Sequence, residues 1–331
     1  MNATWKTFAV AVFWCQAGLA QVAPVTILEI DLENRVNYAA DVSDISKFAT
    51  DPNRTTAVAS RNFRTFLQLG DIVAVNGRPA RGTQVLRGQT INISTAPNPG
   101  QAVADTTEQL SSDSVYQILQ QDGTPIGSLM VTGLGGGDTP PGAVAGSLQG
   151  DSVIVGGTGA FLGVRGQQSV GPLPVATRNA SVTEDPVNRR RIGGGSARVI
   201  FTLIPRSLPE VVITANGPSV LHADFSPVTA AKPARAGEVL ILTATNLGPT
   251  RPGVDPGKPF PATGPLLEVN SPVDVTVNGQ AAEVVNKIGW PGLENVYRVD
   301  FRVPEGTAAG MAAIQLSAAW IAGLPVNVPV Q

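Results

Sequence analysis

The chain has almost no sulfur or imidazole chemistry available to it. Its 331 residues include a single cysteine, Cys15, and a single histidine, His222. Because Cys15 lies in an N-terminal segment that we expect to be removed, the mature chain has no thiol for a disulfide, a nucleophile or a metal site. One imidazole also excludes a site built from several histidines. We therefore expect a fold stabilised by core packing alone, without a metal or another cofactor.

Charge is scarce as well. Asp, Glu, Lys and Arg make up 15% of the residues, and the formal net charge is -2. This balance provides no basic field that would hold nucleic acid or an anionic membrane surface, so no nucleic-acid partner is expected. We interpret the run Arg189–Arg191, in a glycine-rich stretch, as a solvated loop tip rather than a phosphate site.

Glycine and proline, in contrast, are abundant, with 36 and 27 residues. This composition favours many short strands joined by turns over helices, and the length allows two domains. The Pro-rich stretch Pro205–Pro209 is the predicted junction. We therefore expect an all-β protein with one domain over residues 22–206 and a second over residues 212–331.

The N-terminal residues 1–20 have the features of an export signal. Lys6 supplies a positive charge, Phe8–Trp14 an apolar segment, and Gly18–Ala20 a small-x-small cleavage site. An apolar segment this short cannot remain as a membrane span. The sequence predicts an exported protein, extracellular, cell-surface or periplasmic, with no integral membrane segment after cleavage.

Turn signals divide both halves into strands. Asn76-Gly77 lies between apolar runs and predicts a type I′ hairpin turn into a strand over Thr83–Ser94. Asn278-Gly279 predicts a second hairpin of the same kind. Residues 22–206 hold about eight or nine predicted strands, which is typical of a closed antiparallel β-barrel. Residues 212–331 hold about seven, which is typical of an immunoglobulin-like β-sandwich.

A glycine-rich segment, Asp151–Gln168, lies at the centre of the first half and reads DSVIVGGTGAFLGVRGQQ. Gly157–Gly159 could belong to a dinucleotide-binding turn, but such a turn needs a helix directly after it. Gly171 and the prolines that follow it would stop that helix. We instead predict a tight bend between strands at Ser152–Val155 and Phe161–Val170, in which glycines allow strong coiling or a close backbone approach.

The same segment resembles the motifs of plant dirigent proteins and of allene oxide cyclase. The matching residues are Gly157, Thr158, Gly159, Phe161, Gly163, Val164, Gly166 and Gln167. Both families share an eight-stranded antiparallel β-barrel with a hydrophobic cavity, so the resemblance implies that fold over roughly residues 22–206. It also suggests a homotrimer.

The resemblance implies candidate cavity residues. Allene oxide cyclases use a glutamate, asparagines and a cysteine around a fatty-acid epoxide, and dirigent proteins use aspartate and arginine to steer phenoxy radicals. The cysteine has no counterpart in the mature chain. Arg87, in VLRGQ, resembles the dirigent arginine, and Arg165 belongs to the central motif. Glu29 and Asp31 lie on the first predicted strand, where a family acid is expected.

These four residues would polarise or protonate a substrate in the cavity. Alternation places Glu29 and Asp31 on the same face of their strand but does not say which face is inside. The alternative interpretation, in which each is a rim salt bridge or a solvated side chain, therefore stays open.

Other catalytic arrangements find little support. A Ser-His-Asp triad would have to use His222, and Asp224, two residues away, is a poor orienting partner. We therefore expect a structural role for His222.

The second half resembles a C-terminal β-domain of exported acidobacterial proteins, which has no assigned chemistry. The resemblance covers roughly residues 212–331, and its segments are Ala215–Gly217, His222–Asp224, Pro233-Ala234, Gly237-Glu238, Thr245–Pro249, Val277–Gly279 and Val303-Pro304.

Three functions follow from these observations. The first is a secreted barrel that binds a hydrophobic small molecule or acts as a scaffold, with a C-terminal attachment or interaction domain. The second is a cyclase-like or dirigent-like protein acting on an oxylipin or a phenolic radical. The third is a barrel filled by its own side chains. The lack of cysteine and the single histidine favour the first.

Overall fold

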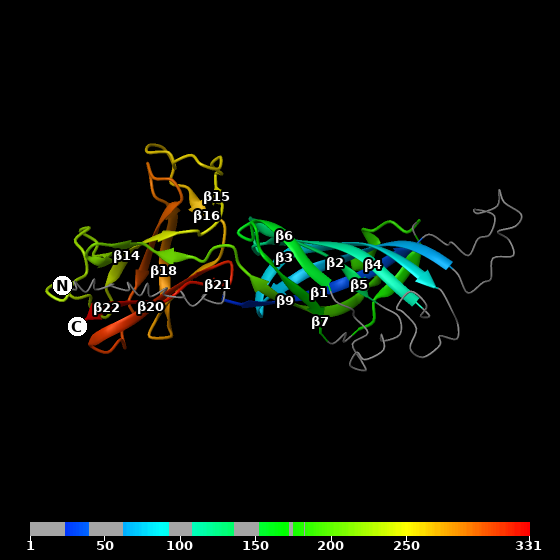
Figure 1. Cartoon of the computed structure of the whole chain (residues 1–331), viewed down its shortest axis with the longest axis horizontal. Helices are drawn as coiled ribbons and strands as arrows, with labels where there is room; N and C mark the ends of the chain where they lie inside the picture. The colour runs from blue at the N-terminus through cyan, green and yellow to red at the C-terminus, as the bar shows by residue number, and fades with distance from the viewer. Residues whose placement is uncertain (1–23, 40–61, 93–107, 136–151, 172–174, 182) are drawn as a thin grey trace, which may run out of the picture.

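The structure is a computed structural model that describes residues 24–39, 62–92, 108–135, 152–171, 175–181 and 183–331. The predicted export signal lies outside these residues. The described chain is all-β apart from one short helix, α1 (Asn188–Ile192), which is far too short to cross a membrane. Figure 1 shows two bodies that lie end to end, a barrel and a C-terminal domain.

The first body is the predicted eight-stranded antiparallel β-barrel. Its strands follow the order β2-β3-β4-β5-β6-β7-β9-β1, and pairing of β1 with β2 closes the ring. The strands are β1 (Thr26–Ala39), β2 (Asn62–Val75), β3 (Arg78–Asn92), β4 (Glu108–Leu119), β5 (Pro125–Gly135), β6 (Ser152–Gly159), β7 (Arg165–Val170) and β9 (Gly195–Ile204). A short strand, β8 (Arg178–Ser181), pairs in parallel with the end of β1.

Alternation along each strand sorts side chains between the interior and the outer wall. On β1, Leu28, Ile30 and Leu32 are fully buried inside the barrel. Glu29 and Asp31 alternate with them and therefore lie on the outer wall.

Both predicted hairpin turns are confirmed. Asn76 and Gly77 have φ values of 47° and 72° between β2 and β3. Asn278 and Gly279 have φ values of 51° and 80° between two strands of the C-terminal domain. Asparagine and glycine tolerate positive φ better than other residues, which explains why these pairs mark the turns.

The glycine-rich segment forms a strand, a turn and a strand in the predicted order, but the turn lies at residues 160–164 rather than at the glycines before Phe161. β6 ends at Gly159, and β7 follows the turn without an intervening helix. A Cβ on Gly157 would lie 2.5 Å from the carbonyl oxygen of Phe161, which is a close backbone approach that only glycine permits. The turn folds back so that Phe161 and Val164 are buried in the barrel core.

The C-terminal domain is one curled antiparallel sheet around its own hydrophobic core. Its strands are β10 (Glu210–Val211), β13 (Val220–Leu221), β14 (Val239–Thr245), β15 (Thr250–Arg251), β16 (Glu268–Val269), β17 (Val273–Val277), β18 (Gln280–Gly289), β19 (Val296–Arg302), β20 (Gly310–Ala318), β21 (Ile321–Ala322) and β22 (Val326–Val330). A separate ribbon joins β11 (Ile213–Thr214) to β12 (Gly217–Pro218).

Strand β18 gives this sheet its shape. It pairs with β17 at its start and with β19 along the rest of its length. The sheet is therefore continuous and curls into a half-barrel, and the predicted immunoglobulin-like sandwich is not confirmed.

The C-terminal domain closes the neighbouring end of the barrel. The turn between β20 and β21 enters the barrel core, where Ala319 and Ile321 are 1% and 4% exposed and Trp320 packs beside them. We call this end of the barrel the domain end, and the opposite end the far end. The barrel core therefore contains residues from both bodies.

Polar contacts reinforce this junction. Arg78 binds both carboxylate oxygens of Asp274, at 2.8 and 2.7 Å. Arg251 donates to the Thr124 hydroxyl at 2.8 Å, and the Gln120 amide donates to a backbone carbonyl of the C-terminal domain. Contacts from β3 and from the turn between β4 and β5 therefore hold the barrel to the C-terminal domain.

Candidate functional site

The barrel interior changes character between its two ends. Toward the domain end it is filled by aliphatic and aromatic side chains, which are Leu28, Ile30, Leu32, Ile72, Ile118, Ile126, Leu129, Ile154, Phe161, Phe201 and Leu203. Toward the far end most of the inward-facing residues are polar or small, and they include Arg35, Gln68, Gln84, Gly88, Ser112, Ser114, Ser152 and Gln168, whereas Phe66, Leu86 and Val170 are apolar exceptions. We call this second region the polar half.

A β-bulge in β1 turns Arg35 into the polar half. Leu32 and Arg35 face the same side although they are three residues apart, because the pairing with β9 shifts between them. Asn34, inside the bulge, has a φ of 52°. An extra residue at a bulge reverses the alternation of the strand beyond it. Arg35 therefore faces inward, whereas Glu29 and Asp31 face outward.

Arg35 is 7% exposed and makes close contacts with β2. With the carboxamide oxygen of Gln68 facing the guanidinium, that oxygen accepts from Nη2 at 2.8 Å and from Nε at 3.2 Å. The aliphatic part of Arg35 lies against Gly70, where an added Cβ would be 3.1 Å from Cγ. The third nitrogen, Nη1, is buried and has no hydrogen-bond partner in the described part of the chain.

Tyr116 marks the border between the two halves of the interior. Its ring packs edge-on against Phe201 with centroids 4.9 Å apart, and its hydroxyl accepts from Nε2 of Gln84 at 3.1 Å. Ser114 also hydrogen-bonds this hydroxyl. Burial raises the pKa of Tyr116 to about 12, against a smaller opposing effect of Arg35 and these hydrogen bonds. Tyr116 therefore stays protonated at neutral pH and is a donor rather than a base.

The polar half carries a positive charge. Burial lowers the pKa of Arg35, but a guanidinium in a protein keeps its proton. None of the described side chains that face the interior is a carboxylate. The arrangement can therefore bind an electron-rich oxygen, through the free Nη1 and the hydroxyl and amide groups beside it.

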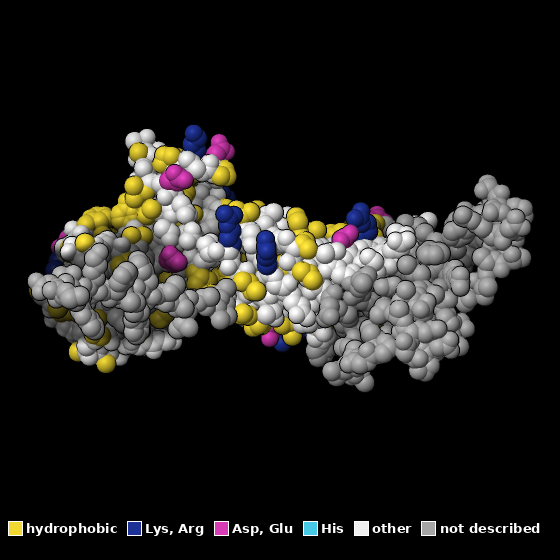
Figure 2. Space-filling model, viewed as in Figure 1, with side chains coloured by type: hydrophobic (Ala, Val, Ile, Leu, Met, Phe, Trp, Pro, Cys, Tyr) yellow, Lys and Arg dark blue, Asp and Glu magenta, His cyan; other side chains and the backbone are white. Residues whose placement is uncertain are grey.

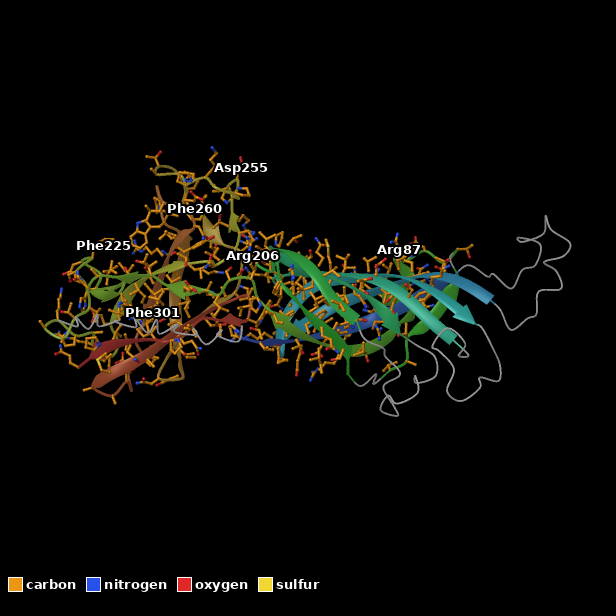
Figure 3. All side chains as sticks on the ribbon, in the orientation of Figure 1. Arg87, Arg206, Phe225, Asp255, Phe260 and Phe301 are labelled. Carbon is orange, nitrogen blue, oxygen red and sulfur yellow. The ribbon has the colours of Figure 1, made fainter. Side chains whose placement is uncertain are left out.

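The four residues expected in the cavity lie elsewhere. Glu29 and Asp31 pair on the outer wall with Arg198, at 3.4 and 2.7 Å. Arg87 projects from the outside of the barrel (Figure 3), where it is 75% exposed and 3.1 Å from Asp113.

Arg165 is likewise exposed on the outer face of β7. The structure therefore brings none of the four into the interior, and their surroundings match the alternative interpretation of surface ion pairs and solvated side chains. Simple alternation hid the residues that do face inward, because it places Arg35 on the same side as Glu29. Asn34 could have indicated the bulge from the sequence, since asparagine tolerates the positive φ that a bulge requires.

A separate ionic cluster fixes the bulge from outside. Asp71, on β2, accepts from Arg189 at 2.5 Å, from Arg190 at 2.8 Å and from Asn34 at 3.0 Å. Although burial works in the opposite direction, the hydrogen bonds from Arg190 and Arg189 lower the pKa of Asp71 to about 2. The interpretation of Arg189–Arg191 as a solvated loop tip is thus wrong for Arg189, whose side chain is 11% exposed, whereas Arg190 binds the same carboxylate but is 65% exposed.

His222 has a structural environment, as expected. Its Nδ1 lies 2.6 Å from a carboxylate oxygen of Glu238, and its Nε2 lies 3.1 Å from the carbonyl oxygen of Lys232. Asp224 binds Lys232 and Ser226 instead of the imidazole. Both ring nitrogens are occupied, so His222 has no free nitrogen to act as a catalytic base.

A groove of about 690 Å³ lies between the two bodies. The glycine-rich turn lines it on the barrel side, and Phe260 and Asp255 line it on the other side, with Arg206 at the junction (Figure 3). Among the described residues, none of the buried polar atoms without a partner belongs to its lining. The polar half of the barrel is therefore the better candidate for a site.

The outer wall carries an exposed aliphatic band. Val85, Val115 and Met130 are direct neighbours across β3, β4 and β5, and each is more than a third exposed. Leu67 and Val153 are exposed on the flanking strands. Figure 2 shows hydrophobic side chains on the visible face of the barrel.

The described residues contain no group of three or more His, Cys, Asp or Glu side chains placed to hold a metal ion. Comparisons of the chain with protein-family models, with curated proteins and with solved structures found no match.

Proposed function

We propose that this chain is an exported binding protein whose barrel holds a small molecule in its polar half. The observation that carries the proposal is a row of small inward-facing residues. Gly88, Ser112, Gly133 and Ser152 pair in sequence across β3, β4, β5 and β6, and Gln168 follows on β7. An eight-stranded barrel is normally just filled by its side chains, so we infer that residues this small leave room for a ligand.

The lining supports a ligand with polar groups. Buried polar side chains normally have hydrogen-bond partners, and one without a partner suggests a missing molecule or a functional role. Arg35 has such an atom in Nη1. The hydrophobic molecule that the sequence predicts would instead suit the domain end, but that half is already packed with side chains.

Binding is better supported than catalysis. A cyclase-like or dirigent-like reaction on an oxylipin or phenolic radical would use a polarising acid or base in the cavity. The described interior offers no carboxylate, and the pKa of Tyr116 is raised to about 12, far from neutral. The third alternative, a barrel filled by its own residues, fits the domain end but not the polar half.

The C-terminal domain is proposed to be the attachment or interaction domain of this exported protein. It has its own core and is fixed to the domain end of the barrel. An immunoglobulin-like arrangement of its strands stays a prediction. We also propose that the chain forms trimers, as the resemblance suggests, and that the exposed aliphatic band over Val85, Val115 and Met130 is buried between copies.

The proposal is tested by filling the polar half. We expect purified protein to retain or acquire a small molecule in native mass spectra after incubation with a mixture of phenols and fatty-acid epoxides. Ser114→Leu and Ser152→Leu add side-chain volume inside the barrel and should abolish this added mass. Ser169→Leu adds the same volume on the outer face of β7 and should not.

A bound ligand should also stabilise the folded protein, by about 2.7 kcal/mol at a ligand concentration of about 100 times Kd. Its melting temperature should rise accordingly. Protein without added mass in every condition would contradict the proposal and favour a structural role.

A further inference from the structure

We propose that the polar half is a receptor for a carboxylate, which the guanidinium of Arg35 binds through its end formed by Nη1 and Nη2. This inference rests on the proposed function, because it names the chemical group that the barrel recognises. It assigns a role to the one arginine that the interior contains among the described residues.

The first argument is the uncompensated charge. Arg35 is 7% exposed, and its pairing within the described residues is with the neutral amide of Gln68. Charged side chains are almost never fully buried unless they are paired, because removal from water is unfavourable for the charged form. A carboxylate is the counter-ion that matches a guanidinium best, since its two oxygens accept two parallel hydrogen bonds.

The second argument is the geometry of the free donors. The Gln68 oxygen occupies the side of the guanidinium formed by Nε and Nη2. The end formed by Nη1 and the second hydrogen of Nη2 is left, and Nη1 is buried without a partner in the described chain. A carboxylate that meets this end would complete the hydrogen bonds of Arg35.

The third argument concerns the orientation of the ligand. Tyr116 closes the polar half against the packed core, so no apolar chain can extend beyond it toward the domain end. The ligand therefore enters with its carboxylate first, and the rest of the molecule lies along the row of small residues toward the far end. This favours a compact acid over a long-chain lipid whose tail fills the core.

The experiment compares acids with their methyl esters. Isothermal titration calorimetry of the purified protein would use benzoate with methyl benzoate, and hexanoate with methyl hexanoate. Hydrogen bonds to a charged group in a buried site predict that each acid binds about 10- to 100-fold more tightly than its ester. Arg35→Met keeps an unbranched, though shorter, side chain, removes the charge, and should abolish this difference.

Arg198→Met is the matched control, because it makes the same substitution at an arginine on the outer wall of the barrel. It should leave the preference for the acid unchanged. The wild-type comparison of acid with ester decides the question even if the Arg35→Met protein does not fold.

The outcomes separate the two proposals. Equal binding of acids and esters to the wild-type protein, or an acid preference that survives Arg35→Met, would overturn the carboxylate assignment and leave the binding function standing. Failure of every acid and every ester to bind would also overturn the carboxylate assignment, and the native mass spectra with phenols and epoxides then decide the binding function.

Discussion

A single carboxylate determines the position of the bulge that carries Arg35. Asp71 accepts hydrogen bonds from Asn34, inside the bulge, and from two arginines of α1. These contacts come from three segments that are far apart in the sequence, so one side chain fixes their relative positions. The site residue and the residue that positions it thus lie on opposite faces of the barrel wall.

Asp71→Asn should destabilise the protein at neutral pH. The folded-state pKa of Asp71 is lowered to about 2, below the value near 3.9 of an unfolded chain. The stabilisation is therefore complete above about pH 5 and is lost as the pH falls toward 2, and it amounts to about 2–3 kcal/mol. Urea denaturation at pH 7 and at pH 3 measures it.

The variant should show a smaller loss of stability between these two pH values than the wild type. Asp113→Asn is the control, because the ion pair between Asp113 and Arg87 is exposed and exposed ion pairs contribute little to the free energy of unfolding. Equal free energies of unfolding for Asp71→Asn and wild type at pH 7 would contradict this account.

At the scale of the element, the glycine-rich turn shows how neighbouring residues of the same type have different roles. An added Cβ on Gly157 would lie 2.5 Å from the Phe161 carbonyl oxygen and 2.7 Å from that of Ser128. An added Cβ on Gly156 would have no heavy atom within 4 Å. Of the two, only Gly157 must be glycine, because neighbouring backbone approaches it closely.

Gly157→Ala should therefore lower the free energy of unfolding by about 1–3 kcal/mol, because the turn must move away from the new methyl group. Gly156→Ala should be neutral or slightly stabilising, because it meets open space and restricts the unfolded chain. Chemical denaturation of the two variants, side by side, tests the difference. A loss of stability shared equally by both would show that the close approach is not the cause.

The sequence predicted the regular elements better than the irregular ones. Turn chemistry at Asn76 and Asn278 and the alternation of strands depend on nearest neighbours, so they could be read directly. The bulge at Asn34 depends on pairing with β2 and β9, which the local pattern does not contain. For this reason the expected cavity residues lay on the outer wall and Arg35 was missed. The half-barrel likewise arises from β18, which changes partners along its length.

For the whole molecule, the important feature is that the barrel core is shared. Ile321 and Ala319 belong to the C-terminal domain but are buried among barrel residues. Removal of apolar surface from water is the main stabilising contribution to such a contact. We therefore expect the two bodies to unfold together rather than in separate steps.

Ile321→Ala should cost about 2–5 kcal/mol, the usual range for a buried isoleucine, and should split a single unfolding transition into two. Leu324→Ala, at a side chain that is 56% exposed, should have little effect. Differential scanning calorimetry distinguishes one transition from two. Two transitions already present in the wild-type protein would contradict the shared core.

The closed domain end also determines how the barrel exchanges its contents. Because the β20–β21 turn blocks one end, a ligand must enter and leave by the far end, along the same path. A change that narrows this path should slow association and dissociation by the same factor and leave the dissociation constant unchanged. Residence time in this protein can therefore be altered independently of affinity.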